Sequence, residues 1–165
     1  MPRPPLPAEP HLVTDYRIEK VRCPVTVVLT DGECIAGDIF LNTTSRFRAA
    51  PQDPAEFLNQ ADEGYFAVAA VDGRAMLVAK ENVERVEAPG ITTPAQDPSL
   101  HAIGIALTVS TGAVFEGSVL LDTPEGRSRL LDYLNSHREQ FLQVHQPDRV
   151  MLVNRRAITH VRELN

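Results

Sequence analysis

The feature that most constrains the fold of this chain is an internal repeat. Residues 25–41, with the sequence VTVVLTDGECIAGDIFL, correspond to residues 105–121, with the sequence IALTVSTGAVFEGSVLL. Each copy has a glycine in its central turn and a second glycine five residues later, and these are Gly32, Gly37, Gly112 and Gly117. Further on, the triplet Met-Leu-Val at 76–78 recurs at 151–153, an offset of 75. The sequence therefore predicts a duplicated unit.

Apolar and polar residues alternate on either side of each central turn. Val25, Val27 and Leu29 fall on one face of the predicted strand, and the second copy repeats the pattern. A period of two predicts a β-hairpin in each copy, with Asp31-Gly32 or Thr111-Gly112 at its tip. The second glycine of each copy falls at an inward position, where it permits the sharp bend of a small barrel.

The rest of each copy predicts a helix followed by three strands. The predicted helices are 54–60 and 128–140, and Asn59 and Asn135 are interpreted as left-handed helix terminators. The predicted third and fourth strands are 65–71 and 73–80 in the first copy and 141–144 and 148–155 in the second, each pair followed by a short turn and a last strand. We therefore expect a mostly β fold with short helices, in which each copy is a five-stranded, strongly bent barrel with a helical insertion between strands two and three.

Proline-rich segments divide the chain into parts. Residues 1–20 contain the opening MPRPPLPAEP and are predicted to be a tail and lead-in. The first barrel is assigned to 21–88, a linker to 89–100 and the second barrel to 101–165. Because each unit is small enough to be marginal alone, we expect the copies to bury surface against one another or against a second chain.

Composition and charge exclude several classes of protein. No apolar run approaches the roughly 20 residues that cross a bilayer, and no basic-then-apolar segment opens the chain, so a cytoplasmic protein without membrane contact is expected. The net charge is −6, which disfavours general affinity for nucleic acid. Residues 21–88 hold eleven acids and six bases (net −5), whereas 101–165 hold seven of each (net zero). Only the second copy could offer a basic patch.

The two cysteines are predicted to be separate thiols. With the tip at Asp31-Gly32, Cys34 would pair with about Leu29, which places Cys23 roughly 20 Å away along the strand. A disulfide requires Cα atoms within about 7 Å.

The order of these elements resembles the Sm-like fold, a small barrel that is also similar to the Src-homology-3 barrel. The segments VVLTDGECIAG and LTVSTGAVFEG match its first motif, and LVNRRAITHV looks like the closing motif of the bacterial RNA chaperone Hfq. The usual Asp and Asn signature between strands two and three is replaced by the helical connector. The resemblance implies that the closing motif could contact RNA or another anion, through Asn154, Arg155 and Arg156, with Lys80 as the match of Arg155.

The sequence contains no recognisable catalytic or metal-binding pattern. The five histidines lack metal-ligand spacing, and neither a nucleophile elbow nor a catalytic cysteine signature is present. We therefore predict a non-enzymatic protein without cofactor or metal.

Apolar residues on the face opposite the predicted core are the remaining signal. A small barrel buries one face internally, so an apolar outer face is expected to be covered by the helix, the sister copy or another chain. The predicted protein interface consists of Val28, Phe40, Leu120, Met76, Val78, Met151 and Val153. The leading prediction is a protein-binding or assembly module that self-associates or has a protein partner, and the alternative is an RNA-binding protein that uses the second closing motif.

Overall fold

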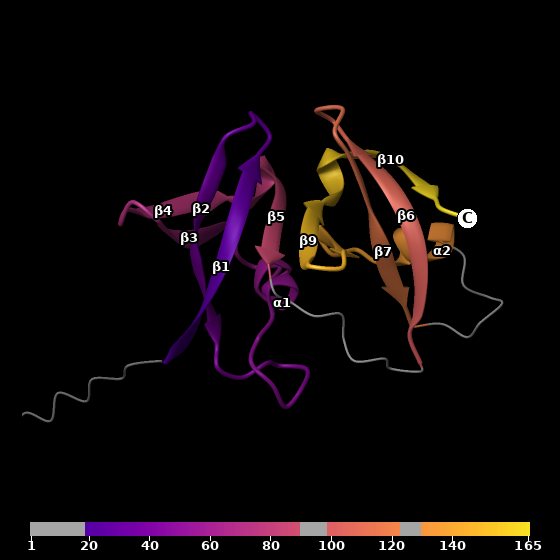
Figure 1. Ribbon diagram of the computed structural model, residues 1–165. Helices are drawn as coiled ribbons and strands as arrows, with labels where there is room; N and C mark the ends of the chain where they lie inside the picture. Colours follow the sequence, from indigo (N-terminus) through magenta and orange to yellow (C-terminus); the bar gives the residue numbers. More distant parts are fainter. Residues whose placement is uncertain (1–18, 90–98, 123–129) are drawn as a thin grey trace, which may run out of the picture.

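The two halves of the chain contain the same elements in the same order (Figure 1). The computed structural model describes residues 19–89, 99–122 and 130–165. We call 19–89 the first half and the described part of 99–165 the second half. The first half contains β1 (Lys20–Leu29), β2 (Cys34–Asn42), α1 (Pro54–Leu58), β3 (Tyr65–Ala70), β4 (Ala75–Ala79), the 3-10 turn η1 (Lys80–Asn82) and β5 (Val83–Pro89). The second contains β6 (His101–Val109), β7 (Val114–Leu121), α2 (Leu130–Ser136), β8 (Phe141–His145), β9 (Arg149–Asn154), η2 (Arg155–Ala157) and β10 (Ile158–Glu163).

Most of the predicted tail and linker lie outside the described residues, in 1–18 and 90–98. The start of the second predicted helix, within 123–129, lies outside them as well. Each described helix lies between the second and third strands of its half, as predicted. In α1, the Asp53 side chain caps the helix by accepting from the Glu56 N–H at 2.7 Å, and Pro54 occupies the first turn. Among the described residues, no helix is long and apolar enough to span a membrane.

All ten strands belong to one open antiparallel sheet. Their order is β10-β6-β7-β8-β9-β5-β1-β2-β3-β4, so each half contributes five neighbouring strands. The halves are joined where β5 pairs with β9, with Val86 opposite Leu152 (Figure 1). The expectation of two separate closed barrels therefore differs from the structure. Strand pairing across the boundary merges the two halves into a sheet that does not close.

Strand β9 is buried on both of its faces. Val150 and Leu152 point into a core made mostly by the first half, whereas Met151 and Val153 belong to the core of the second half. All four side chains are almost completely inaccessible to solvent. An apolar pattern on both faces is the pattern of a strand that is covered on both sides. In this strand the cover comes from the other half of the same chain.

Two hairpins turn at a glycine with positive φ. Gly32 has φ +90° and Gly112 has φ +87°, a conformation that other L-residues adopt at a steric cost. In the first hairpin the Leu29 N–H donates to the Glu33 carbonyl at 2.8 Å, and Cys34 pairs with Val28. The loop is thus one residue longer than predicted, and Cys34 does not face Leu29. Both cysteines are free, as predicted.

Gly37 and Gly117 lie where the third strand of each half crosses the second. A Cβ atom added at Gly37 would lie 2.4 Å from the Ala69 carbonyl oxygen, and one at Gly117 would lie 2.7 Å from the His145 carbonyl oxygen. Pairing between β2 and β3 is confined to Gly37 and its neighbour Asp38. The missing side chain lets two backbones approach closely at the point where the sheet changes direction.

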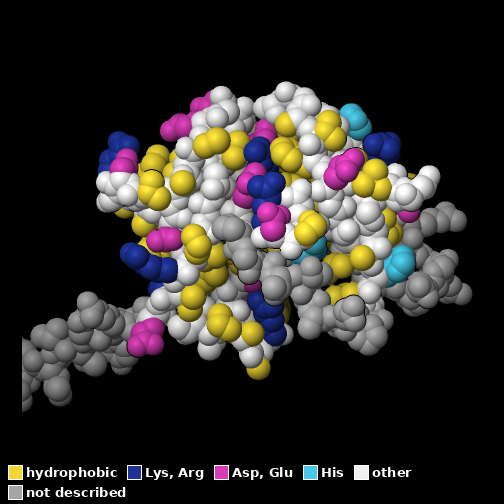
Figure 2. All heavy atoms as spheres, in the orientation of Figure 1, with side chains coloured by type: hydrophobic (Ala, Val, Ile, Leu, Met, Phe, Trp, Pro, Cys, Tyr) yellow, Lys and Arg dark blue, Asp and Glu magenta, His cyan; other side chains and the backbone are white. Residues whose placement is uncertain are grey.

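A charged network also joins the halves beside the β5–β9 pair. Glu84 is buried, accepts a hydrogen bond from the Thr111 hydroxyl at 2.9 Å and pairs with Arg85 at 2.5 Å. Arg85 also contacts Glu87, and Glu87 contacts Arg149 across the boundary at 2.8 Å. Side chains of both charge signs accordingly gather in the middle of the face drawn in Figure 2. Because each buried charge has a partner, the network can exist without an uncompensated ion.

Candidate functional site

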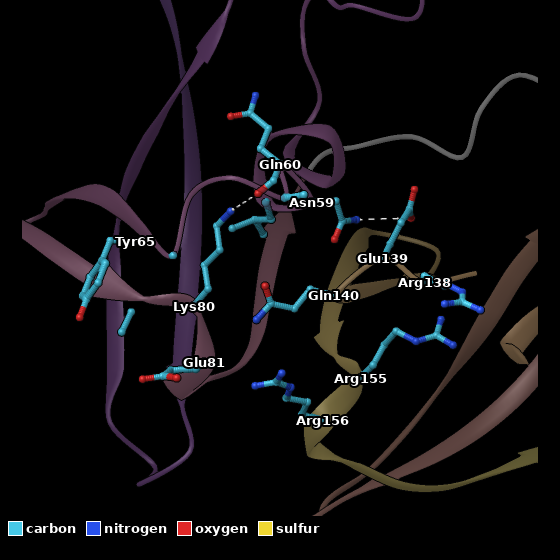
Figure 3. A pocket seen from close by; sticks show the side chains of 14 residues that line it. Asn59, Gln60, Tyr65, Lys80, Glu81, Arg138, Glu139, Gln140, Arg155 and Arg156 are labelled. Carbon is cyan, nitrogen blue, oxygen red and sulfur yellow. Dashed lines mark hydrogen bonds between the residues drawn. The ribbon is translucent and has the colours of Figure 1, made fainter. Parts of the chain in front are cut away.

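The most prominent depression lies where the closing turns of the two halves meet (Figure 3). We call it the junction pocket; its volume is about 840 Å³. Its lining comprises residues 58–61, 64–65 and 79–81 of the first half and 138–140 and 155–156 of the second. Figure 3 shows Lys80 and Glu81 on the side of the first half, opposite Arg138, Arg155 and Arg156 on the side of the second.

Basic side chains outnumber acidic ones around this pocket. Four cations line it, from Lys80, Arg138, Arg155 and Arg156, against the two carboxylates of Glu81 and Glu139. In a chain whose net charge is −6, this is a local excess of positive charge. Arginine offers forked donors to phosphate or carboxylate, so the pocket has the chemistry to hold an anion.

Lys80 is buried although it carries a charged group. Its side chain is 2% exposed, and its ammonium Nζ donates to the Gln60 carbonyl at 3.0 Å (Figure 3). Burial lowers the pKa of Lys80, and the charge of Glu63 opposes part of that shift. The long side chain thus fixes the 58–61 segment to the first closing turn.

The second closing turn presents its two arginines differently. Arg155 is half-buried, and its Nη2 donates to the Leu134 carbonyl at the end of α2. Arg156 is exposed. Of the two predicted anion contacts, Arg156 is therefore the freer to meet a ligand, and Arg155 also fixes α2.

Asn154 is a structural residue, which corrects its predicted place among the anion contacts. It is buried, its Nδ2 donates to the Val83 carbonyl at 2.9 Å, and its Oδ1 accepts from the Arg156 N–H at 3.1 Å. All of its polar atoms are thus used to hold η2 against the first half. The prediction differs from the structure because the sequence does not show that β9 adjoins β5.

Asn59 bridges the halves, a role that the sequence did not suggest. Its Oδ1 accepts from the Phe141 N–H at 2.9 Å, and its Nδ2 donates to the Phe141 carbonyl at 3.2 Å. A longer contact of 3.5 Å reaches Glu139 (Figure 3). The interpretation of Asn59 as a left-handed terminator is wrong, since its φ is −87°. The recurring Leu-Asn pair was the signal in the sequence, but it does not reveal the partner.

The predicted apolar interface is divided between the interior and the surface layer. Val28, Val78, Met151 and Val153 are buried within the fold, so they are not free to meet another protein. Phe40, Leu120 and Met76 are half-buried. The strongly exposed apolar side chains of the described residues lie elsewhere, at Phe47, Tyr65, Val71, Leu77, Val114 and Leu131.

The two ends of the sheet are β4 and β10. Among the described residues, neither strand has a second neighbour in the sheet order. Leu77 on β4 is 77% exposed, whereas Leu152, which follows the same Met and precedes the same Val in β9, is 0% exposed. An exposed apolar strand with a free hydrogen-bonding edge is a surface on which another strand can add.

No protein-family model matches this chain, and neither does any curated protein or solved structure. Within the described residues, no group of three or more His, Cys, Asp or Glu side chains is placed to hold a metal ion.

Proposed function

We propose that this protein is a non-enzymatic assembly module, made of two tandem Sm-like units that arose by internal duplication, and that it binds a second copy of itself through the free edges of its sheet. The observation that carries the proposal is the exposure of Leu77 on β4, the strand that corresponds to the fully buried β9. Edge pairing supplies backbone hydrogen bonds, and alternate side chains supply specificity.

The joint between β5 and β9 serves as the template for this contact. In it Val86 lies opposite Leu152. At the offset of 75, β10 corresponds to β5 and β4 corresponds to β9, so Val161 of a second copy would lie opposite Leu77. Both side chains are apolar, and the pair would cover the exposed leucine.

The charges near β4 also suit β10. In the joint, Glu87 contacts Arg149. Their counterparts at the offset of 75 are Arg162 and Arg74, and Asp72 pairs with Arg74 at 2.5 Å on the surface. Arg162 of the second copy would therefore meet the Asp72 carboxylate as well as Arg74. A head-to-tail contact of this kind gives a ring if the rotation closes and a filament if it does not.

The test is the molar mass in solution, measured by sedimentation velocity over a hundredfold range of concentration. The wild-type chain should form oligomers, and Leu77→Lys should shift it to monomers because a charge would be placed in the strand contact. Leu131→Lys is the matched control, since Leu131 is also a strongly exposed leucine but lies on α2. A wild-type chain that stays monomeric throughout, or equal masses for the two variants, would overturn the proposal.

Binding of single-stranded RNA at the junction pocket is a second candidate, favoured by the excess of cations that line it. Binding should weaken steeply with salt, because each bound phosphate releases counterions. Replacing Arg155 and Arg156 together by alanine should reduce the salt slope by about 0.7 for each phosphate that the variant no longer binds. The double variant Arg22→Ala, Arg46→Ala removes the same charge from exposed positions outside the pocket and should bind as the wild type does. Absence of binding at low salt would eliminate this candidate.

A further inference from the structure

A second, smaller cavity lies on the side of the helices, between the start of α1 and the sheet of the second half. We call it the helix-side cavity; its volume is about 330 Å³. The first half contributes the segment around Pro54, and the second half contributes residues from β7, β8, β9 and α2. This volume is at the lower end of the range of roughly 300–1,000 Å³ that is usual for small-molecule sites.

The cavity lining is mainly apolar. Val150 and Leu152 of β9 form a part that is shielded from solvent, and Leu120 and Ala55 add half-buried apolar surface. Water needs two to four polar partners to be held well in such a space. An apolar molecule of matching size would therefore fill it better than water does.

His145 provides a polar group without a partner in the same cavity. Its side chain is 9% exposed, and among the described residues its Nδ1 is the buried side-chain nitrogen or oxygen that makes no hydrogen bond. Buried polar atoms in proteins almost always have a partner, so an exception requires an explanation. Burial lowers the pKa of His145, which keeps the ring uncharged at neutral pH.

The other charged groups of the cavity neutralise one another. The Nη2 of Arg48 contacts the Oδ2 of Asp53 at 2.9 Å, and both side chains are partly exposed. Tyr133 and Gln143 are uncharged polar groups of the lining, and burial raises the pKa of Tyr133, with a further contribution from Glu139 and an opposing one from Arg155. An uncharged ligand therefore suits the site better than an ion does.

We propose that the helix-side cavity binds a small, uncharged, mainly apolar molecule that carries a hydroxyl group, and that this hydroxyl forms a hydrogen bond with Nδ1 of His145. A neutral imidazole accepts at Nδ1 in one tautomer and donates there in the other. A hydroxyl group both donates and accepts, so it suits either tautomer. The site is independent of the proposed assembly, since β4 and β10 do not line it.

Nuclear magnetic resonance of the full chain tests this proposal, with benzyl alcohol as the probe and toluene as its counterpart without the hydroxyl. Benzyl alcohol should shift the methyl signals of Leu120, Val150 and Leu152 and the ring nitrogen signals of His145. Toluene should bind at least fivefold more weakly, because it leaves Nδ1 without a partner. His145→Ala should abolish this preference, and Arg138→Ala, which alters the junction pocket, should preserve it.

Leu120→Trp provides a second test that does not depend on how His145→Ala folds. The indole should fill the cavity and abolish binding of both probes, while the spectrum remains that of a folded chain. The proposal would be overturned if neither probe perturbed these methyl groups in the wild type, which would mean that the cavity holds water only. Equal affinities for benzyl alcohol and toluene in the wild type would also overturn it.

Discussion

Strands β4 and β9 contain the same triplet, Met-Leu-Val, but they differ in their surroundings. Leu152 in β9 is 0% exposed, and Leu77 in β4 is 77% exposed. The difference arises because β9 is paired with β5 and lies between two cores, whereas β4 ends the sheet. The comparison shows that an apolar pattern on both faces encodes a strand that can be covered on both sides. Whether it is covered depends on the neighbour that the fold supplies.

The partner strands β5 and β10 differ in the same sense. Glu84 of β5 is buried and bonded to Thr111 of the other half, whereas its counterpart Thr159 of β10 is exposed. The cation–π contact of Arg85 with Phe115, at 4.5 Å, also crosses the boundary. The joint thus combines apolar burial with a charged network that the free edges lack.

The largest expected effect comes from truncating the two equivalent leucines. Leu152→Ala should lower the free energy of unfolding by about 2–5 kcal/mol, because it opens a cavity between the two halves. Leu77→Ala should change it by less than about 0.5 kcal/mol, as is usual at an exposed position. Urea denaturation at a concentration where the chain is monomeric measures both. Similar losses of stability in the two variants would contradict the assignment of β4 as an edge strand.

The crossing glycines test what the halves have in common. Gly37→Ala and Gly117→Ala should each cost about 3 kcal/mol, because the new methyl group would overlap a backbone carbonyl and force the strands apart. Gly64→Ala is the control, since no atom lies within 4 Å of a Cβ placed there. Thermal unfolding of the three variants measures the difference, and a harmless Gly37→Ala would disprove the close crossing.

The charged network at the joint should have a smaller effect. Thr111→Val removes the hydroxyl that donates to the buried Glu84 carboxylate, and we expect a decrease in stability of about 1.5 kcal/mol. Thr30→Val lies beside the other hairpin, where the side chain is exposed, and should be nearly neutral. Equal stabilities of the two variants in urea would show that Glu84 does not depend on the second half.

The smallest expected effect concerns pH and His145, whose counterpart in the first half is Ala70. Burial lowers the pKa of His145 in the folded chain, so the unfolded chain takes up a proton more readily as the pH falls. This contribution to stability is present above the unfolded value of about 6.5 and is lost as the pH falls below it. The melting temperature of the wild type should therefore fall more between pH 7.5 and 5.5 than that of His145→Ala. Parallel curves would exclude a buried neutral imidazole.

The positions of most strands could be predicted from local sequence. Period-two alternation around Gly32 and Gly112 indicated both hairpins, and the helical spacing of the connectors indicated α1 and α2. Arg155 and Arg156 were found in the closing motif by the same means, and they do line the junction pocket. These features depend on neighbours in sequence, so steric and turn preferences suffice to indicate them.

The sequence by itself thus determined a pair of five-stranded halves, and the tertiary structure alone decided how they meet. Pairing of β5 with β9 buried Met151 and Val153, turned Asn154 into a brace and left Leu77 on the surface. No local pattern encodes this choice, because β4 and β9 have equivalent sequences and either could have paired with β5. The physical reason is that burial depends on contacts between residues far apart in the chain. Asn59 with Phe141 and Glu84 with Thr111 are such contacts, and they become visible only when the strands are assembled.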